Sequence, residues 1–68
     1  MKVEFYAFEV TSTGYACDPS IHRLEHRAIQ AAKRIARRGA IARVTKDRPP
    51  FDFSNGWEVW DSRNAHTN

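Results

Sequence analysis

Apolar residues recur every three or four positions across residues 18 to 38, and this spacing predicts one long amphipathic helix. Asp18 suits the position before the first helical turn, Pro19 suits the first turn itself, and Gly39 suits the end. At about 100° per residue, eight apolar residues share one side and should face a core. They are Ile21, Leu24, Ala28, Ile29, Ala31, Ala32, Ile35 and Ala36.

Three other stretches have patterns typical of strands. Residues 2 to 11 are rich in aromatic and β-branched types, and residues 40 to 47 and 57 to 61 are also strand-like, although the alanines of the second stretch fit a helix equally well. Alternation in the first stretch is imperfect. Either a bulge near Tyr6 or Ala7 gathers the apolar side chains on one face, or both faces of this strand are buried.

Turn residues separate these stretches. A turn signal at residues 12 to 14 precedes residues 15 to 17, which lead into the helix or form a short return strand. Residues 48 to 56, RPPFDFSNG, interrupt regular structure because proline lacks an amide donor and Asn-Gly favours a turn. We therefore expect a single domain over residues 1 to 61 and a flexible polar tail over residues 62 to 68.

The order of these elements predicts an α+β fold of the type β-α-β-β. A right-handed crossover through the helix makes the first and second strands parallel, and the third strand fits between them, antiparallel to both. The expected architecture is a three-stranded sheet in the order 1-3-2 with one long helix packed on one face. Phe5, Phe8, Val44 and one tryptophan would complete the core, and the other face of the sheet would stay open to a partner.

Composition limits the classes of function. A chain of 68 residues with 41% hydrophobic residues supports one small core and leaves little room for an enclosed active site. A single cysteine excludes an internal disulfide, and no stretch resembles a signal peptide or a membrane span. Neither a nucleophile elbow nor a glycine-rich phosphate loop is present. We expect a cytoplasmic, non-enzymatic protein that needs no cofactor and contacts no membrane, and an enzyme is the remote alternative.

Charge is distributed unevenly along the chain, whose formal net charge is +3. The outward side of the predicted helix holds six bases and no acid, whereas Glu4, Glu9, Glu58 and Asp61 fall in the predicted strands. Such a basic side can bind phosphates or a partner protein, or it can simply keep a small protein soluble. The candidate partner-binding residues of this side are Arg23, Arg27, Gln30, Lys33, Arg34, Arg37 and Arg38.

A second candidate set combines aromatic residues near the turn with acidic residues of the strands. Aromatic side chains on a loop can stack on bases or enter a protein pocket, and they can also fold back over a small core. Because side chains alternate along a strand, one tryptophan should lie on the outer face of the sheet. These candidate partner-binding residues are Phe51, Phe53, Trp57, Trp60, Glu4 and Glu58.

Two histidines have a spacing that can hold a metal ion. His22 and His26 are four residues apart, so on a helix both could bind one zinc ion. Further ligands would have to come from Cys17 or His66. Two exposed histidines are the favoured interpretation, and no metal site is expected.

The overall plan of the chain resembles a group of known proteins. A short first strand, the helical segment Gln30-Ala31-Ala32-Lys33-Arg34-Ile35-Ala36 and a hairpin bearing tryptophan resemble small bacteriophage accessory proteins, among them anti-CRISPR proteins that inhibit type I surveillance complexes. The resemblance implies an inhibitor that binds a host nucleic-acid-processing complex, such as a CRISPR surveillance complex, and blocks it sterically. That group has no diagnostic motif, so no residue roles follow from it. Many of its members are acidic, whereas this helix is basic, so direct binding of nucleic acid through the helix is the alternative.

Overall fold

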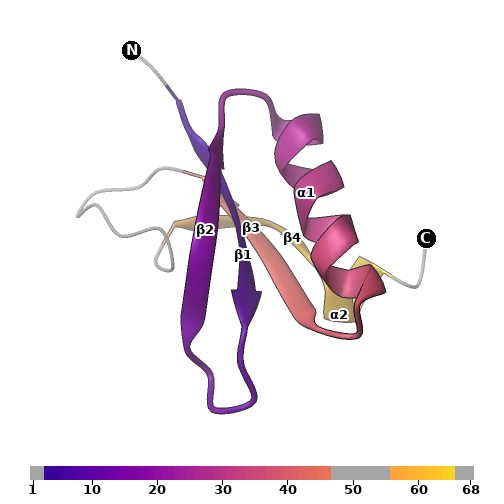
Figure 1. Ribbon diagram of the computed structural model, residues 1–68. Helices are drawn as coiled ribbons and strands as arrows, with labels where there is room; N and C mark the ends of the chain where they lie inside the picture. Colours follow the sequence, from indigo (N-terminus) through magenta and orange to yellow (C-terminus); the bar gives the residue numbers. More distant parts are fainter. Residues whose placement is uncertain (1–2, 47–55, 66–68) are drawn as a thin grey trace.

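The computed structural model of the protein describes residues 3 to 46 and 56 to 65. A four-stranded sheet and a long helix form two layers, which confirms the predicted α+β class (Figure 1). The elements in chain order are β1 (Phe5–Val10), β2 (Ala16–His22), α1 (Glu25–Arg37), β3 (Ile41–Lys46), β4 (Trp57–Asp61) and the short α2 (Ser62–Ala65).

The sheet is antiparallel throughout, in the order β2-β1-β3-β4. The predicted three-stranded sheet of order 1-3-2 is therefore wrong in its strand number and order. The difference arises because β1 and β2 form a hairpin, which reverses the chain before the helix begins. As a result α1 connects β2 to β3, two parallel strands that flank β1, and β4 pairs with the outer side of β3.

The predicted helix start at residue 18 is also wrong, because residues 16 to 22 pair with β1 as a strand. The register shifts between Ala7 and Glu9, so two residues of β2, Asp18 and Pro19, lie opposite Phe8. Asp18 has a φ of 52°, a left-handed conformation that aspartate tolerates better than most residues. Proline is compatible with a bulge on an edge strand, where a missing amide donor breaks no regular ladder.

The core lies between α1 and the sheet. Its fully buried members are small, namely Ala7, Ala28, Ala32, Ala42 and Val44, so the helix can approach the strands closely. Partly buried apolar residues pack around this cluster, and they are Phe5, Ile29, Ala31, Ile35, Ala36, Val59 and Trp60. The predicted apolar side of α1 is thus confirmed from Ala28 onward. Ile21 and Leu24 precede the helix and are exposed by 59% and 53%.

The opposite face of the sheet also contains buried side chains. Antiparallel partners point to the same face, so Tyr6 lies beside Thr45 and Phe8 beside Arg43, on the side away from Val44 and the helix. Phe8 and Thr45 are fully buried and Tyr6 is 3% exposed. The expectation of an open face is therefore wrong. Pairing of β1 with β3 is unbroken from Phe5 to Val10, so burial on both faces, and not a bulge in β1, explains the imperfect alternation.

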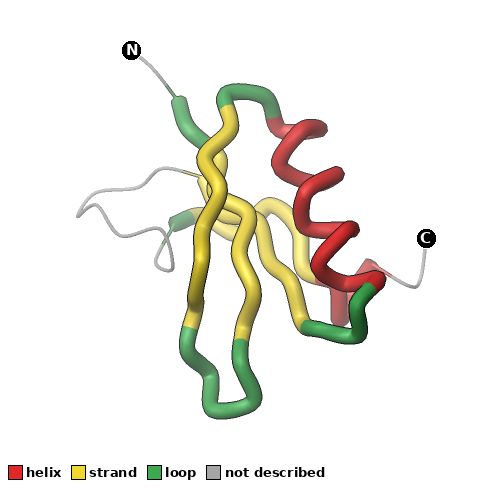
Figure 2. The backbone as a smooth tube through the Cα atoms, viewed as in Figure 1, coloured by secondary structure: helices red, strands yellow, loops and turns green. Residues whose placement is uncertain are grey.

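The chain continues from β4 directly into α2, so the first four residues of the predicted tail are helical. The amide of Ala42 donates a hydrogen bond to Ser62 Oγ at 3.0 Å and connects α2 to β3. Figure 2 shows α2 close to the C-terminal end of α1, and the two helices are in contact. Within residues 3 to 46 and 56 to 65, no helix has the length and apolar character needed to cross a membrane.

Candidate nucleic-acid interface

The outward side of α1 carries most of the predicted helix set. Arg27, Gln30, Lys33, Arg34 and Arg37 are all exposed, on the side of α1 opposite the buried Ala28 and Ala32. Arg38 is exposed at the C-cap of the helix. Arg23 is exposed in the turn between β2 and α1, so the structure places it beside the helix end and not on the helix. We call Arg27, Gln30, Lys33, Arg34, Arg37 and Arg38 the basic helix face.

Local sequence explains why this face forms where it does. Glu25 lies in the first turn of α1 and Arg34 and Arg37 lie in the last turn, each the sign of charge that the helix dipole favours at that end. Gly39 has a φ of 89°, and its amide donates to the carbonyl of Ala36 at 3.0 Å. This left-handed residue ends the helix, as predicted.

Four exposed side chains of the basic helix face line one open depression of the surface, which we call the surface cavity. Gln30, Lys33, Arg34 and Arg37 line a space of about 260 Å³. Their positions are i, i+3, i+4 and i+7, the four corners of one diamond on a helix surface. Three corners carry a formal positive charge, and Gln30 supplies the uncharged corner. We call these four residues the basic diamond.

The bases of the basic helix face form no ion pair within the described part of the chain. Among the residues that the structure describes, the ion pairs involve Arg43 and Arg63 only, and none includes Arg23, Arg27, Lys33, Arg34, Arg37 or Arg38. Glu25 is the acid of α1, but its neighbours three and four positions later are Ala28 and Ile29. An ion pair within the helix is therefore not available to the basic helix face.

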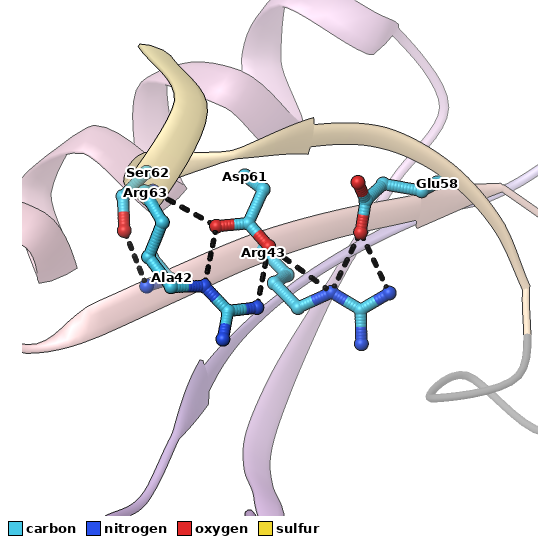
Figure 3. A network of polar contacts seen from close by, with 6 residues as sticks. All are labelled: Ala42, Arg43, Glu58, Asp61, Ser62 and Arg63. Atoms are coloured by element: carbon cyan, nitrogen blue, oxygen red, sulfur yellow. Dashed lines mark hydrogen bonds and ion pairs between the residues drawn. The ribbon is translucent and has the colours of Figure 1, made fainter. Parts of the chain in front are cut away.

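Arg43 of β3 and Arg63 of α2, by contrast, are paired with acids in one polar network (Figure 3). Arg43 contacts Glu58 through Nη2 at 2.8 Å and lies 3.7 Å from Asp61 through Nε. Arg63 donates to Asp61 from its amide at 2.8 Å, from Nε at 3.0 Å and from Nη2 at 2.6 Å. The guanidinium of Arg43 also lies 5.7 Å from the centre of the Phe8 ring. Acid and base thus largely neutralise each other at this end of the sheet.

The network shifts the protonation of its members. Side-chain hydrogen bonds from Arg63 hold the pKa of Asp61 below its ordinary range, although burial opposes this. The same hydrogen bonds raise the pKa of Arg63. Both groups are therefore charged at neutral pH. Sequence reasoning placed Asp61 among the acids of the strands but missed its two partners. The pairing of β3 with β4 brings Arg43 to Asp61, and the start of α2 brings Arg63, two residues after Asp61, to the same carboxylate.

The described members of the predicted loop and sheet set differ in exposure and in their contacts. Trp57 is 60% exposed, whereas Trp60 packs against the core, so the exposed tryptophan is Trp57. Glu4 accepts a hydrogen bond from the hydroxyl of Tyr6 at 3.1 Å, and Glu58 is engaged by Arg43. Phe51 and Phe53 lie outside the described residues.

The helical spacing proposed for His22 and His26 is wrong, because His22 belongs to β2 and His26 to α1. His22 Nε2 lies 2.8 Å from Ser20 Oγ. These two residues are two apart, so strand alternation would have placed them on one face if β2 had been recognised. In the part of the chain that the structure describes, no group of three or more His, Cys, Asp and Glu side chains could hold a metal ion.

Comparison with known proteins does not assign this arrangement to a family. No protein-family model matches the chain, and neither a curated protein nor a solved structure matches it.

Proposed function

We propose that the protein binds nucleic acid, without catalysing a reaction, through phosphates that contact the basic helix face. One observation carries this proposal: Arg43 of β3 and Arg63 of α2 are paired with neighbouring acids, whereas the bases clustered on α1 form no ion pair among the described residues. Like charges held together on one helix repel each other. A polyanion would relieve this repulsion and release counterions as it binds.

The dimensions of the helix suit a nucleic-acid backbone. Arg27 and Arg37 are ten residues apart, which corresponds to about 15 Å along a helix axis. Duplex DNA presents roughly one phosphate for every 1.7 Å of its axis. Several phosphates therefore lie within reach of the helix, and long arginine and lysine side chains can meet them without a precise fit.

A second candidate function is the sterically acting inhibitor that the resemblance implies. The exposed Trp57 on the edge strand β4 favours it, because tryptophan is among the residues that most often dominate protein interfaces. Against it, Glu58 and Asp61 are already engaged by Arg43 and Arg63, so these acids are less available to a basic partner surface. We therefore rank nucleic-acid binding first.

Fluorescence anisotropy with a labelled oligonucleotide at two salt concentrations tests the leading proposal. Replacement of Arg27, Arg34 and Arg37 by Glu should abolish binding. As a matched control, Arg34→Glu should weaken binding far more than Lys46→Glu, which makes the same charge change at an exposed position of β3. The slope of log K against log salt should also fall, by about 0.9 on duplex DNA or about 0.7 on a single strand, for each phosphate that the variant no longer neutralises. Unchanged binding by the triple variant would refute the proposal.

A separate experiment tests the inhibitor. The protein is used to capture partners from a nuclease-treated bacterial lysate, with Trp57→Ala as the comparison. A stoichiometric protein partner that depends on Trp57 would support the inhibitor. Recovery of no such partner, together with salt-dependent oligonucleotide binding, would support the leading proposal alone.

A further inference from the structure

The basic diamond concentrates more positive charge than one internal phosphodiester can balance. Lys33, Arg34 and Arg37 occupy three corners of the same surface cavity, and none of them has an acidic partner among the described residues. Four residues at these spacings form a hole of the kind that accepts one side chain when helices pack together. Because three of the corners are cationic, the complementary group is a compact anion with more than one negative charge.

We propose that the basic diamond binds the terminal phosphomonoester of a nucleic-acid strand. This inference depends on the proposed function and specifies its ligand. A phosphomonoester carries a charge of about −1.5 to −2 at neutral pH and offers three strong acceptor oxygens, whereas an internal phosphodiester carries one charge. Arginine and lysine donate to these oxygens, and the amide of Gln30 can donate without adding charge.

Charges beyond the basic diamond identify the source of the phosphate. Arg27 lies about two turns before Arg34 on the same side of the helix, and Arg38 lies one turn after Arg34. These two bases extend the positive surface past the cavity and can contact the phosphodiesters that follow a strand end. A free phosphate or a peptide with one phosphoserine has no such continuation, so a nucleic-acid end is the better match.

Binding of one single-stranded sequence of about 16 nucleotides, prepared with a 5′-phosphate, a 3′-phosphate or hydroxyl ends, tests the inference. At about 0.15 M salt, at least one phosphorylated form should bind roughly tenfold more tightly than the hydroxyl form. Equal affinities of all three forms, with binding retained, would overturn the inference and leave the proposed function standing. If the protein binds none of the three forms, both the inference and the proposed function are overturned.

Variants then locate the preference on the basic diamond. Arg37→Gln should remove the preference for the phosphorylated end, and Gln30→Ala should reduce it roughly threefold although it changes no charge. Arg27→Gln is the matched control outside the diamond, and it should weaken both forms equally and keep their ratio. A ratio that Arg37→Gln and Arg27→Gln change to the same extent would overturn the assignment to the diamond.

A peptide with one phosphoserine in an otherwise uncharged sequence separates the possible sources of the phosphate. It should bind at least about tenfold more weakly than the phosphorylated oligonucleotide, because it lacks the neighbouring phosphodiesters. Equal affinity would overturn the assignment to nucleic acid. Circular dichroism of every variant checks that helix α1 is retained.

Discussion

Asp61→Asn removes the charge at the centre of the network between β3, β4 and α2. Asp61 is 6% exposed and accepts three hydrogen bonds from Arg63, one from its amide and two from its guanidinium. Asparagine keeps the shape and one acceptor oxygen. Its amide group, however, would present donors to a guanidinium that also has only donors.

The magnitude follows from burial and exposure within the network. Hydrogen bonds to a charged group contribute about 1.5–3 kcal/mol each when they are protected from water. The Arg63 side chain is 54% exposed, so solvent screening reduces this value substantially. We expect a total loss of about 2 kcal/mol, which for a domain of this size lowers the unfolding midpoint by roughly 10 °C.

Acidification should remove the difference between the two proteins. Hydrogen bonds from Arg63 hold the pKa of Asp61 below its ordinary range in the folded state, so the unfolded state binds more protons between the two pKa values. The contribution of Asp61 is therefore fully present above its ordinary pKa of about 4 and is lost as the pH falls through the lower folded-state value.

Urea unfolding followed by tryptophan fluorescence measures both effects. The wild-type protein should exceed Asp61→Asn in unfolding free energy at neutral pH, and the difference should shrink at acid pH. Glu58→Gln is the control because its side chain is 45% exposed, and it should cost at most about 0.5 kcal/mol. Equal stabilities at neutral pH, or a difference that does not change with pH, would refute the reasoning.

Three other perturbations test the packing. In a denaturation experiment, Trp60→Ala should lower the unfolding free energy by about 2–3 kcal/mol, because Trp60 packs against the core. Trp57→Ala should lower it by less than about 0.5 kcal/mol, because Trp57 is mostly exposed. Equal losses would contradict this. Gly56→Ala would bring a Cβ into steric conflict with the carbonyl oxygen of Lys46, so we expect a loss of about 2 kcal/mol or more and faster amide exchange in β4; a fully stable variant would contradict the close approach of Gly56 to Lys46. Burial raises the pKa of the Cys17 thiol, helped by nearby acids, so alkylation should be slower in the folded chain than in urea; equal rates would contradict it.

Local sequence predicted much of the fold and most of the candidate interface. The helical period over residues 25 to 37 identified both the apolar side with Ala28 and Ala32 and the basic helix face opposite it. Strand propensity located β1, β3 and β4 to within a few residues. These features depend on spacing between near neighbours, which the order of residues contains directly.

The start of the helix shows where local signals are ambiguous. Asp18 and Pro19 suit the first turn of a helix, and they equally suit a bulge in an edge strand. Pairing with β1 decides between a helix start and a bulged strand, because residues 16 to 22 form hydrogen bonds to β1 that they could not form as part of a helix. Because β2 forms, the helical crossover joins β2 to β3 and does not start from β1. The strand order is therefore β2-β1-β3-β4 and not the predicted 1-3-2.

By itself, then, the sequence determined the class of fold, the end of α1 at Gly39 and the sign of charge on its outward side. Only the tertiary structure decided which of the described bases have a counter-charge. Residues far apart in the chain, Arg43 and Asp61, become neighbours through strand register, so Arg43 gains an acidic partner that no base of α1 has among the described residues. Charge compensation depends on distance in space, and the order of residues does not specify that distance.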